Sequence, residues 1–220
     1  MSLGWPIYAD INSTLRFYNH PLIITGGHYS LSALECDTIL QFGVRLTSPK
    51  TIDYMSCPNR TWIQVSQTRR RHDPFQAINL RIEGSASVID SLIKKEYKVT
   101  IKNTKRLKEV QDNYLKRQTR LKEIVLTQTH LSEPYIVYYL SDQLPELTHL
   151  VIGNSMPIRA FDYFAVKKHK TPIPVIANRG ASGIDGIIST GLGYARKNKD
   201  KTVIILGDYT FLYDLTAYLS

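Results

Sequence analysis

The sequence has little cysteine: Cys36 and Cys57 are the only two among 220 residues. Two cysteines cannot build a disulfide framework, and neither belongs to a C-x-x-C motif or has a histidine partner at zinc-ligand spacing. We therefore expect two free thiols in a reducing compartment and no zinc site. The sequence alone also allows a single bridge between them.

Long hydrophobic runs are absent as well. No stretch of about 18 apolar residues occurs, so the sequence predicts neither a transmembrane helix nor a membrane partner. The opening residues, MSLGWPIYADINS, have no basic start and no long apolar stretch, and they do not predict a secretory signal. These features favour a cytoplasmic location.

Acidic residues are scarce beside basic ones, at 19 against 28, which gives a net charge of +9. Such an excess favours anionic partners, which include nucleic acid, membrane surfaces and acidic small molecules. Much of the charge lies between Lys94 and Ile124, where the part from about Thr104 predicts a helix with solvated faces. Aromatic residues are not spaced as in known nucleic-acid modules, so a solvated helix is favoured over a nucleic-acid contact.

The sequence does contain a regular alternation of strand-like and helix-like segments. Residues 21–25 and 61–67 predict strands. Residues 36–44 predict a passage from helix to strand, and residues 85–95 predict an amphipathic helix. This alternation is typical of an α/β fold, in which a parallel sheet is flanked by helices.

The second half repeats one pattern three times: an apolar strand, a loop and a helix. The loops carry GNSMPIR (153–159), NRGASGID (178–185) and GDYT (207–210), and the helices after them are expected from residues 156, 184 and 211. A further helix precedes the first strand, with Ser132 at its N-cap. The carboxyl ends of parallel strands meet at one sheet edge, where open α/β sheets bind ligands, so the loops predict one shared site.

The first loop offers Ser155 and Arg159. Ser155 stands where it would cap a helix whose first turn includes Pro157. Arg159 follows about one turn along, and its planar fork matches a carboxylate or phosphate. The spacing fits a structural cap and a surface arginine equally well.

The second loop places Arg179 at a strand end, followed by glycines that permit close backbone approach. Open amides at the start of the next helix would favour an anion. Asp185 near that start is interpreted as a cap or a partner of the helix dipole. A tight turn is the alternative interpretation of the whole loop.

The third loop follows the fully apolar strand TVIIL. Gly207 allows a sharp turn or a close ligand approach, and Asp208 puts a carboxylate where Mg²⁺ can bridge it to a phosphate. Capping of the next helix is the alternative role of Asp208. The sequence therefore predicts an anion pocket from the three loops together, since no single loop is decisive.

Together, the motifs GNSMPIR, NRGASGIDGIISTGLG and GDYTFLYDL resemble consecutive signatures of the SEPHCHC synthases. These are 2-succinyl-5-enolpyruvyl-6-hydroxy-3-cyclohexene-1-carboxylate synthases, thiamine-diphosphate enzymes of menaquinone and phylloquinone biosynthesis. The segments GWPIYADINSTLR and RRHDP resemble the family's central domain more loosely. The resemblance implies that residues 1–128 form the central domain and residues 129–220 the first part of the pyrophosphate-binding domain.

The resemblance also implies a transferase reaction. In the family, thiamine diphosphate attacks 2-oxoglutarate, CO₂ leaves, and the succinyl carbanion equivalent adds to isochorismate. Both substrates are acidic and the cofactor is a diphosphate, which suits arginine forks and backbone amides. By motif, Ser155, Arg159 and Arg179 would bind substrate carboxylates.

The family's cofactor residues are carried over in the same way. Asp208 would bind Mg²⁺ (or Mn²⁺), and Gly207 would lie against the pyrophosphate. Ile184 matches the bulky apolar residue that supports the bent cofactor. An ordinary core position at the start of a helix explains Ile184 equally well.

The chain departs from the family's pattern in three places. The pyrimidine-binding domain, with its activating glutamate, has no counterpart here, so no catalytic residue is assigned. The asparagine that completes the metal site lies beyond the position of Ser220 in the family. Pro49 occupies the place of a substrate-facing lysine, so Lys50 is interpreted as a solvated loop residue rather than a ligand.

These departures predict an internal fragment that is inactive alone. Its activity would belong to a homo-oligomeric enzyme that includes the missing pyrimidine-binding domain, in the cytoplasm or, in a photosynthetic eukaryote, in a plastid. The alternative is a non-catalytic anion-binding or assembly module derived from the family.

Overall fold

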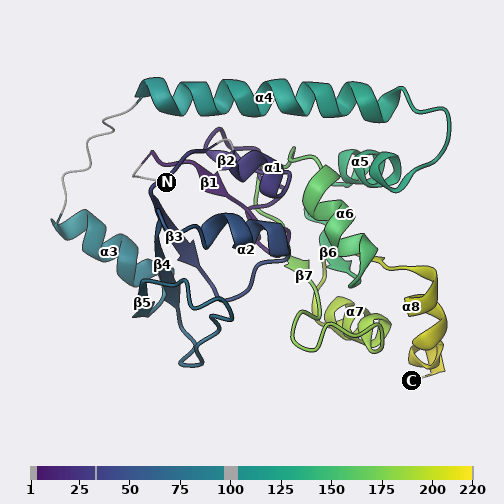
Figure 1. Cartoon of the computed structure of the whole chain (residues 1–220). Coiled ribbons are helices and arrows are strands. Elements are labelled where there is room, and N and C mark those ends of the chain that lie inside the picture. Colours follow the sequence, from purple (N-terminus) through teal and green to yellow (C-terminus); the bar gives the residue numbers. More distant parts are fainter. Residues whose placement is uncertain (1–3, 33, 97–103, 220) are drawn as a thin grey trace. The chain divides into compact units, whose positions relative to one another are not determined.

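The computed structural model describes residues 4–32, 34–96 and 104–219. The chain divides into two compact units, and Figure 1 labels their helices and strands. The first unit comprises Met1–Pro6 and Gly27–Asp112, and the second comprises Ile7–Gly26 and Asn113–Ser220. All strand pairs among the described residues are parallel, and helices flank the sheets, which confirms the α/β fold class.

The first unit is built on a parallel sheet of order β3-β4-β5. Its elements are α1 (His28–Leu31), β3 (Thr38–Phe42), α2 (Pro49–Met55), β4 (Thr61–Ser66), β5 (Leu80–Glu83) and α3 (Ala86–Glu96). The strand expected at 61–67 and the helix expected at 85–95 are confirmed. The helix expected within 36–44 is wrong, because Thr38 to Phe42 pair in register with β4 and form only a strand.

One polar contact explains part of the register between β3 and β4. Trp62 is almost fully buried, and its indole Nε1 donates to Gln41 Oε1 at 2.9 Å across the sheet. A buried indole N–H without such an acceptor would cost about 1–3 kcal/mol. Gln41 therefore accepts a hydrogen bond from the indole N–H of Trp62, which is buried together with the apolar part of the ring.

The helix α4 (Thr104–Leu126) confirms the helix expected from about Thr104. Its residues up to Asp112 belong to the first unit and the rest to the second. Its charged residues are mostly exposed, whereas Val110, Tyr114 and Val125 are buried. Among the described residues, no helix is both long enough and apolar enough to cross a bilayer.

The second unit holds a parallel sheet of order β7-β6-β8 and a separate pair, β1 with β2. Its strands are β1 (Ile7–Tyr8), β2 (Ile23–Ile24), β6 (His149–Ile152), β7 (Val175–Ile176) and β8 (Thr202–Ile205). Its further helices are α5 (Glu133–Gln143), α6 (Met156–Phe164), α7 (Ile187–Lys197), α8 (Asp208–Tyr213) and a 3₁₀ turn at Leu215–Leu219.

The first residues of the helices in this unit can be compared with the starts that the sequence predicts. Ser132 caps α5 as expected, since its side chain accepts from Tyr135 N. Helix α7 begins at Ile187, three residues later than expected, because Gly186 adopts a left-handed conformation at φ 71°. Helix α8 begins at Asp208, three residues earlier than expected, directly after Gly207.

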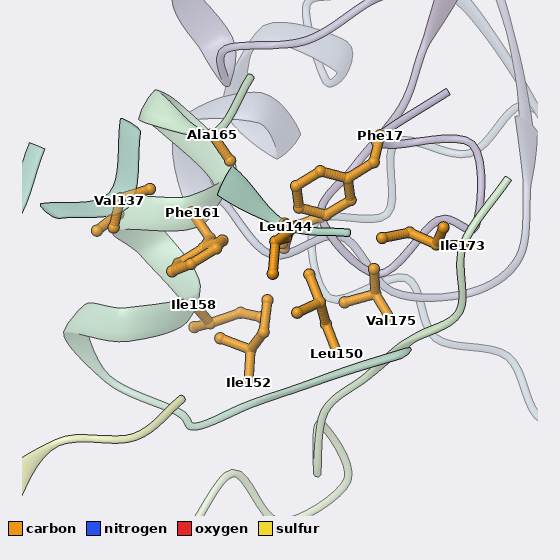
Figure 2. Packing of buried hydrophobic residues seen from close by; sticks show 12 residues of the cluster. Phe17, Val137, Leu144, Leu150, Ile152, Ile158, Phe161, Ala165, Ile173 and Val175 are labelled. Carbon is orange, nitrogen blue, oxygen red and sulfur yellow. The ribbon is translucent and has the colours of Figure 1, made fainter. Parts of the chain in front are cut away.

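The core of the second unit joins distant parts of the sequence (Figure 2). Side chains from α5, α6, β6 and β7 pack together with Ile11 and Phe17 from the N-terminal segment, and both of these are fully buried. Burial of each contributes about 1.5–3 kcal/mol. The N-terminal segment is therefore part of this core. The predicted domain boundary at residue 128 stays a prediction.

Polar contacts fasten the same segment to the end of α6. The Arg16 side chain is fully buried, and its Nη2 donates to the carbonyls of Phe161, Asp162 and Ala165 at 3.0–3.1 Å. These carbonyls belong to the last turn of a helix, where a cation also meets the negative end of the dipole. Arg16 therefore fixes the carboxyl end of α6.

Buried charges surround this contact. Burial and the nearby charge of Asp10 raise the pKa of Asp162 to about 7, although the charge of Arg16 and a hydrogen bond from Ile11 N oppose the rise. Burial, with a smaller effect of Arg16, lowers the pKa of Lys167 to about 8.

Candidate functional site

Three loops leave the same edge of the β7-β6-β8 sheet. The register pairs Val151 with Ile176 and Ile152 with Ile205, so the three strands end at nearly the same level. The loops at 153–155, 177–186 and 206–207 start from these ends. The parallel register confirms that the segments singled out in the sequence begin at one sheet edge.

The turn after β6 leaves little room for a side chain at position 153. Gly153 N donates to Ile205 O at 2.7 Å, and a Cβ on Gly153 would lie 3.2 Å from the Cα and Cβ of Leu206. This separation is shorter than ordinary van der Waals contact, so a larger residue would push the ends of β6 and β8 apart. The first and third loops therefore begin in direct contact.

Asn154 is the central polar residue of this edge. Its side chain is buried, with an exposed fraction of 2%. Its Nδ2 donates to Asn178 O at 3.0 Å and to Gly183 O at 2.8 Å, and its Oδ1 accepts from Arg179 Nη1 at 3.0 Å. One side chain from the β6 loop thus holds two points of the β7 loop backbone and its arginine.

The β7 loop is fastened at its far end by a second amide. Asn178 Nδ2 donates to Thr190 Oγ1 at 3.0 Å and to Gly186 O at 3.4 Å. Arg179 N donates back to Ala177 O at 2.9 Å. The half-buried Arg179 therefore projects from a loop whose backbone is held on both sides.

Ser155 lies at the N-cap position of α6 but does not act as its cap. Its side chain makes no capping hydrogen bond, and its backbone adopts φ 67° and ψ −127°. Positive φ is unfavourable for a residue with a Cβ, and residues strained in this way cluster at functional sites. Ser155 thus takes the expected N-cap position without a capping hydrogen bond, and its exposed hydroxyl stays a candidate for substrate binding.

Arg159 lies one turn further along α6. It is exposed, while Ile158 and Ala160 on either side of it are buried in the core. No hydrogen bond or ion pair joins Arg159 to another described residue. The structure thus brings Arg179 and Asn154 together and leaves Arg159 in solvent.

Gly207 and Asp208 form the end of the third loop. A Cβ on Gly207 would meet no atom within 4 Å, so the backbone there faces open space. Asp208 is exposed in the first turn of α8 and makes no ion pair with any described residue. Metal-ligand clusters of three or more His, Cys, Asp or Glu side chains are absent from the described parts of the chain.

The start of α7 differs from the expected open anion site. Ile188 N and Ser189 N donate to Asp214 Oδ2 at 2.5 and 3.2 Å, and Ser189 Oγ donates to Asp214 Oδ1 at 3.4 Å. A carboxylate of the chain itself thus occupies these amides. Asp185 was expected to serve this helix start, but its Oδ1 instead lies over Gly183, 2.4 Å from where a Cβ would be.

Two other predicted positions lie apart from these contacts. Ile184 is half-buried in the loop before α7, three residues from the helix start. Lys50 is exposed in the first turn of α2 in the first unit, directly after Pro49. Burial and, after it, the positive charge of Lys50 lower the pKa of His28.

Sequence reasoning missed Asn154 and Asp214. Asn154 lies within the motif GNSMPIR, and its only signal is its position directly after Gly153 and the apolar run Leu150–Ile152. Asp214 lies 26 residues beyond the amide of Ile188 that it accepts from, so no local pattern connects them. Both residues organise the edge through long-range contacts.

Comparison with known proteins adds evidence of relationship. No family model matches the chain. Two 2-succinyl-5-enolpyruvyl-6-hydroxy-3-cyclohexene-1-carboxylate synthases align with 98% of it, at 31% identity in Chlorobium phaeobacteroides (strain BS1) and 32% in Prosthecochloris aestuarii. A third relative, Protein PHYLLO, chloroplastic, of Arabidopsis thaliana, is 27% identical over 96% of the chain.

The alignments cover only part of the relatives. The chain spans 38% of the Chlorobium protein, 37% of the Prosthecochloris protein and 14% of the Arabidopsis protein.

Proposed function

Because the chain is homologous along 97–98% of its length to the SEPHCHC synthases, we propose that it forms part of such a synthase, which decarboxylates 2-oxoglutarate and adds the succinyl unit to isochorismate. This reaction belongs to menaquinone and phylloquinone biosynthesis. The observation that carries the proposal is the Arg179–Asn154 contact, which sets an arginine fork at the same sheet edge as Gly207 and Asp208.

Arg179 is the first candidate for binding a substrate carboxylate. Its loop is held by Asn154 and Asn178, so a carboxylate that binds its guanidinium does not have to order the loop as well. A planar guanidinium binds carboxylates in a defined geometry. Arg159 and the Ser155 hydroxyl, both exposed, are proposed as further contacts to the acidic substrates.

Asp208 and Gly207, at the end of β8, would hold a Mg²⁺ ion (or Mn²⁺) and a diphosphate. Mg²⁺ is commonly held by one or two carboxylates together with phosphate oxygens and water, so a single exposed Asp208 suffices as one ligand. The open space beside Gly207 admits a phosphate close to the backbone. Thiamine diphosphate, when bound, would supply the carbanion chemistry of the decarboxylation and the carbon–carbon bond formation.

The chain's own residues would bind and orient the reactants. Arg179 would hold a carboxylate that does not react, so that the reacting carbon keeps one position. Asp208 would hold the metal, and Ile184 is proposed to pack against the cofactor. We assign no general acid or base to this chain. The chain alone is therefore proposed not to convert 2-oxoglutarate and isochorismate to product.

A chimera tests this proposal. The homologous segment of the Chlorobium phaeobacteroides synthase is replaced by this chain, and product formation from 2-oxoglutarate and isochorismate is measured. The chimera should be active, and Arg179→Met should lower kcat/KM by roughly tenfold to a hundredfold, because it removes a charged hydrogen-bonding group. Arg196→Met at the far end of α7 is the matched control and should leave kcat/KM unchanged.

Two results would contradict the proposal. The first is a chimera that unfolds cooperatively and binds thiamine diphosphate but forms no product. The second is equal activity of the Arg179→Met and Arg196→Met chimeras. Binding of 2-oxoglutarate without turnover in the first case would support the non-catalytic anion-binding module instead.

A further inference from the structure

The side-chain amide of Asn154 makes three hydrogen bonds. Its two N–H donors go to main-chain carbonyls of the β7 loop, and its oxygen goes to Arg179 Nη1. This assigns the orientation of the amide, because the flipped group would face carbonyls with its oxygen and the guanidinium with its N–H. A buried amide with three such bonds is a rigid element between two loops.

The contact restricts the guanidinium in a specific way. The guanidinium is planar, so fixing one terminal nitrogen restricts rotation about Nε–Cζ and the plane of the whole fork. The same amide holds the carbonyl of Asn178, which precedes Arg179 directly, and that of Gly183. The backbone and the head of Arg179 are therefore restrained by one side chain.

We propose that Asn154 is a positioning residue for Arg179, fixing the plane of its guanidinium at the sheet edge and thereby its affinity for a carboxylate of the acidic substrate. The substrate part of this inference rests on the proposed function. The orientation of Arg179 can be tested without it.

Two variants separate positioning from simple structural support. Asn154→Leu has nearly the same volume and removes all three hydrogen bonds. Asn154→Asp keeps an oxygen facing Arg179 but removes the amide donors to the loop carbonyls. If Asn154 only supported the loop, the two variants would affect Arg179 alike; if it positions the guanidinium, Asn154→Asp should preserve the restraint that Asn154→Leu loses.

The first measurement is NMR of arginine side chains in the full 220-residue chain. The guanidinium signals of Arg179, assigned with Arg179→Lys, should show slow rotation about Nε–Cζ in wild type and in Asn154→Asp, and fast averaging in Asn154→Leu. Asn198→Leu, which removes one bond from Asn198 Nδ2 to Tyr194 O at the end of α7, is the matched control and should leave these signals unchanged.

The second measurement is titration of the same proteins with 2-oxoglutarate. Affinity should fall by roughly tenfold or more in Asn154→Leu and by less in Asn154→Asp. Absence of binding to wild type would refute the proposed substrate at this edge, while the guanidinium signals would still decide the positioning role.

The positioning role is overturned if Arg179 rotates equally in wild type and Asn154→Leu while the amide spectrum shows a folded second unit. Equal affinity of the two proteins for 2-oxoglutarate also overturns it. If Asn154→Leu unfolds that unit, the comparison of wild type with Asn154→Asp decides: averaging of the Arg179 signals in Asn154→Asp then refutes the inference.

Discussion

At the scale of single residues, the buried carboxyl of Asp162 has an unusual effect on stability. Its pKa is raised from 3.8 to about 7 in the folded chain, mainly by burial and then by Asp10. The folded state therefore binds this proton more tightly than the unfolded state. The contribution of Asp162 to the free energy of unfolding is fully present below pH 3.8 and is lost as the pH rises to about 7.

We predict that Asp162→Asn removes this loss. The free energy of unfolding of the variant, relative to wild type, should rise between pH 4 and pH 7 by an amount on the order of a few kcal/mol. Urea denaturation at each pH measures it. Asp53→Asn, at an exposed position on α2, is the control. A difference between Asp162→Asn and wild type that does not depend on pH would contradict the prediction.

Lys167 should change the free energy of unfolding in a different pH range. Its Nζ donates to His20 O and Ile23 O and lies over the ring of Tyr114, while burial, followed by Arg16, lowers its pKa from 10.5 to about 8. The unfolded state holds this proton more tightly, so its contribution to stability rises between pH 8 and pH 10. Lys167→Met should abolish that rise in denaturation experiments, and Lys168→Met at the exposed neighbouring position should keep it.

At the scale of elements, the packing of α7 on β8 depends on one small residue. A Cβ on Gly191 would lie 2.4 Å from Ile204 Cδ1 and 2.9 Å from its Cγ1. Gly193, two residues on in the same helix, has no atom within 4 Å of the same position. A side chain at position 191 would therefore clash with Ile204, whereas one at position 193 would meet open space.

We predict opposite effects of alanine at these two positions. Gly193→Ala should stabilise the chain by about 0.5–1 kcal/mol, because alanine is the better helix former. Gly191→Ala gains the same propensity but overpacks the contact with Ile204, at a cost of about 1–3 kcal/mol, so it should destabilise. Denaturant midpoints measure both effects, and a shift of the same sign for the two variants would refute this account of the α7–β8 contact.

The elements also show what sequence can reveal. The strands β6 and β8 were predictable because short apolar runs end at glycine, and α5 because Ser132 and Pro134 mark its start. The start of α7 was misplaced because the left-handed backbone of Gly186 leaves no periodic signal. In the site, Arg179 was visible as a charge at a strand end, but Asn154, whose partners lie 24 and 29 residues away, was not.

At the scale of the whole chain, the second unit is discontinuous in sequence. Ile11, Phe17 and Arg16 are buried with α5, α6 and β6. We predict that deleting residues 1–26 exposes this core. Hydrogen exchange should then show loss of protection in α6 and β6, while β3, β4 and β5 of the first unit keep theirs.

A milder variant checks the same point without truncation. Phe17→Ala should lower the free energy of unfolding of the second unit by about 3–5 kcal/mol, because it leaves a cavity in the core. Phe75→Ala, at an exposed position in the first unit, is the control. Unchanged exchange in β6 after the deletion would show that the N-terminal segment is dispensable.

The place of Arg16 has a consequence for the order of events during synthesis. Arg16 leaves the ribosome 145 residues before Phe161, whose carbonyl it binds. At about 5–20 residues per second, this interval lasts roughly 7–30 s. Residue 112, the last of the first unit, is made 161 − 112 = 49 residues before Phe161, so that unit has roughly 2–10 s of this interval to fold. The segment that holds Arg16 is thus translated well before the helix that it binds, and its apolar side chains reach their buried positions only after α6 has been made.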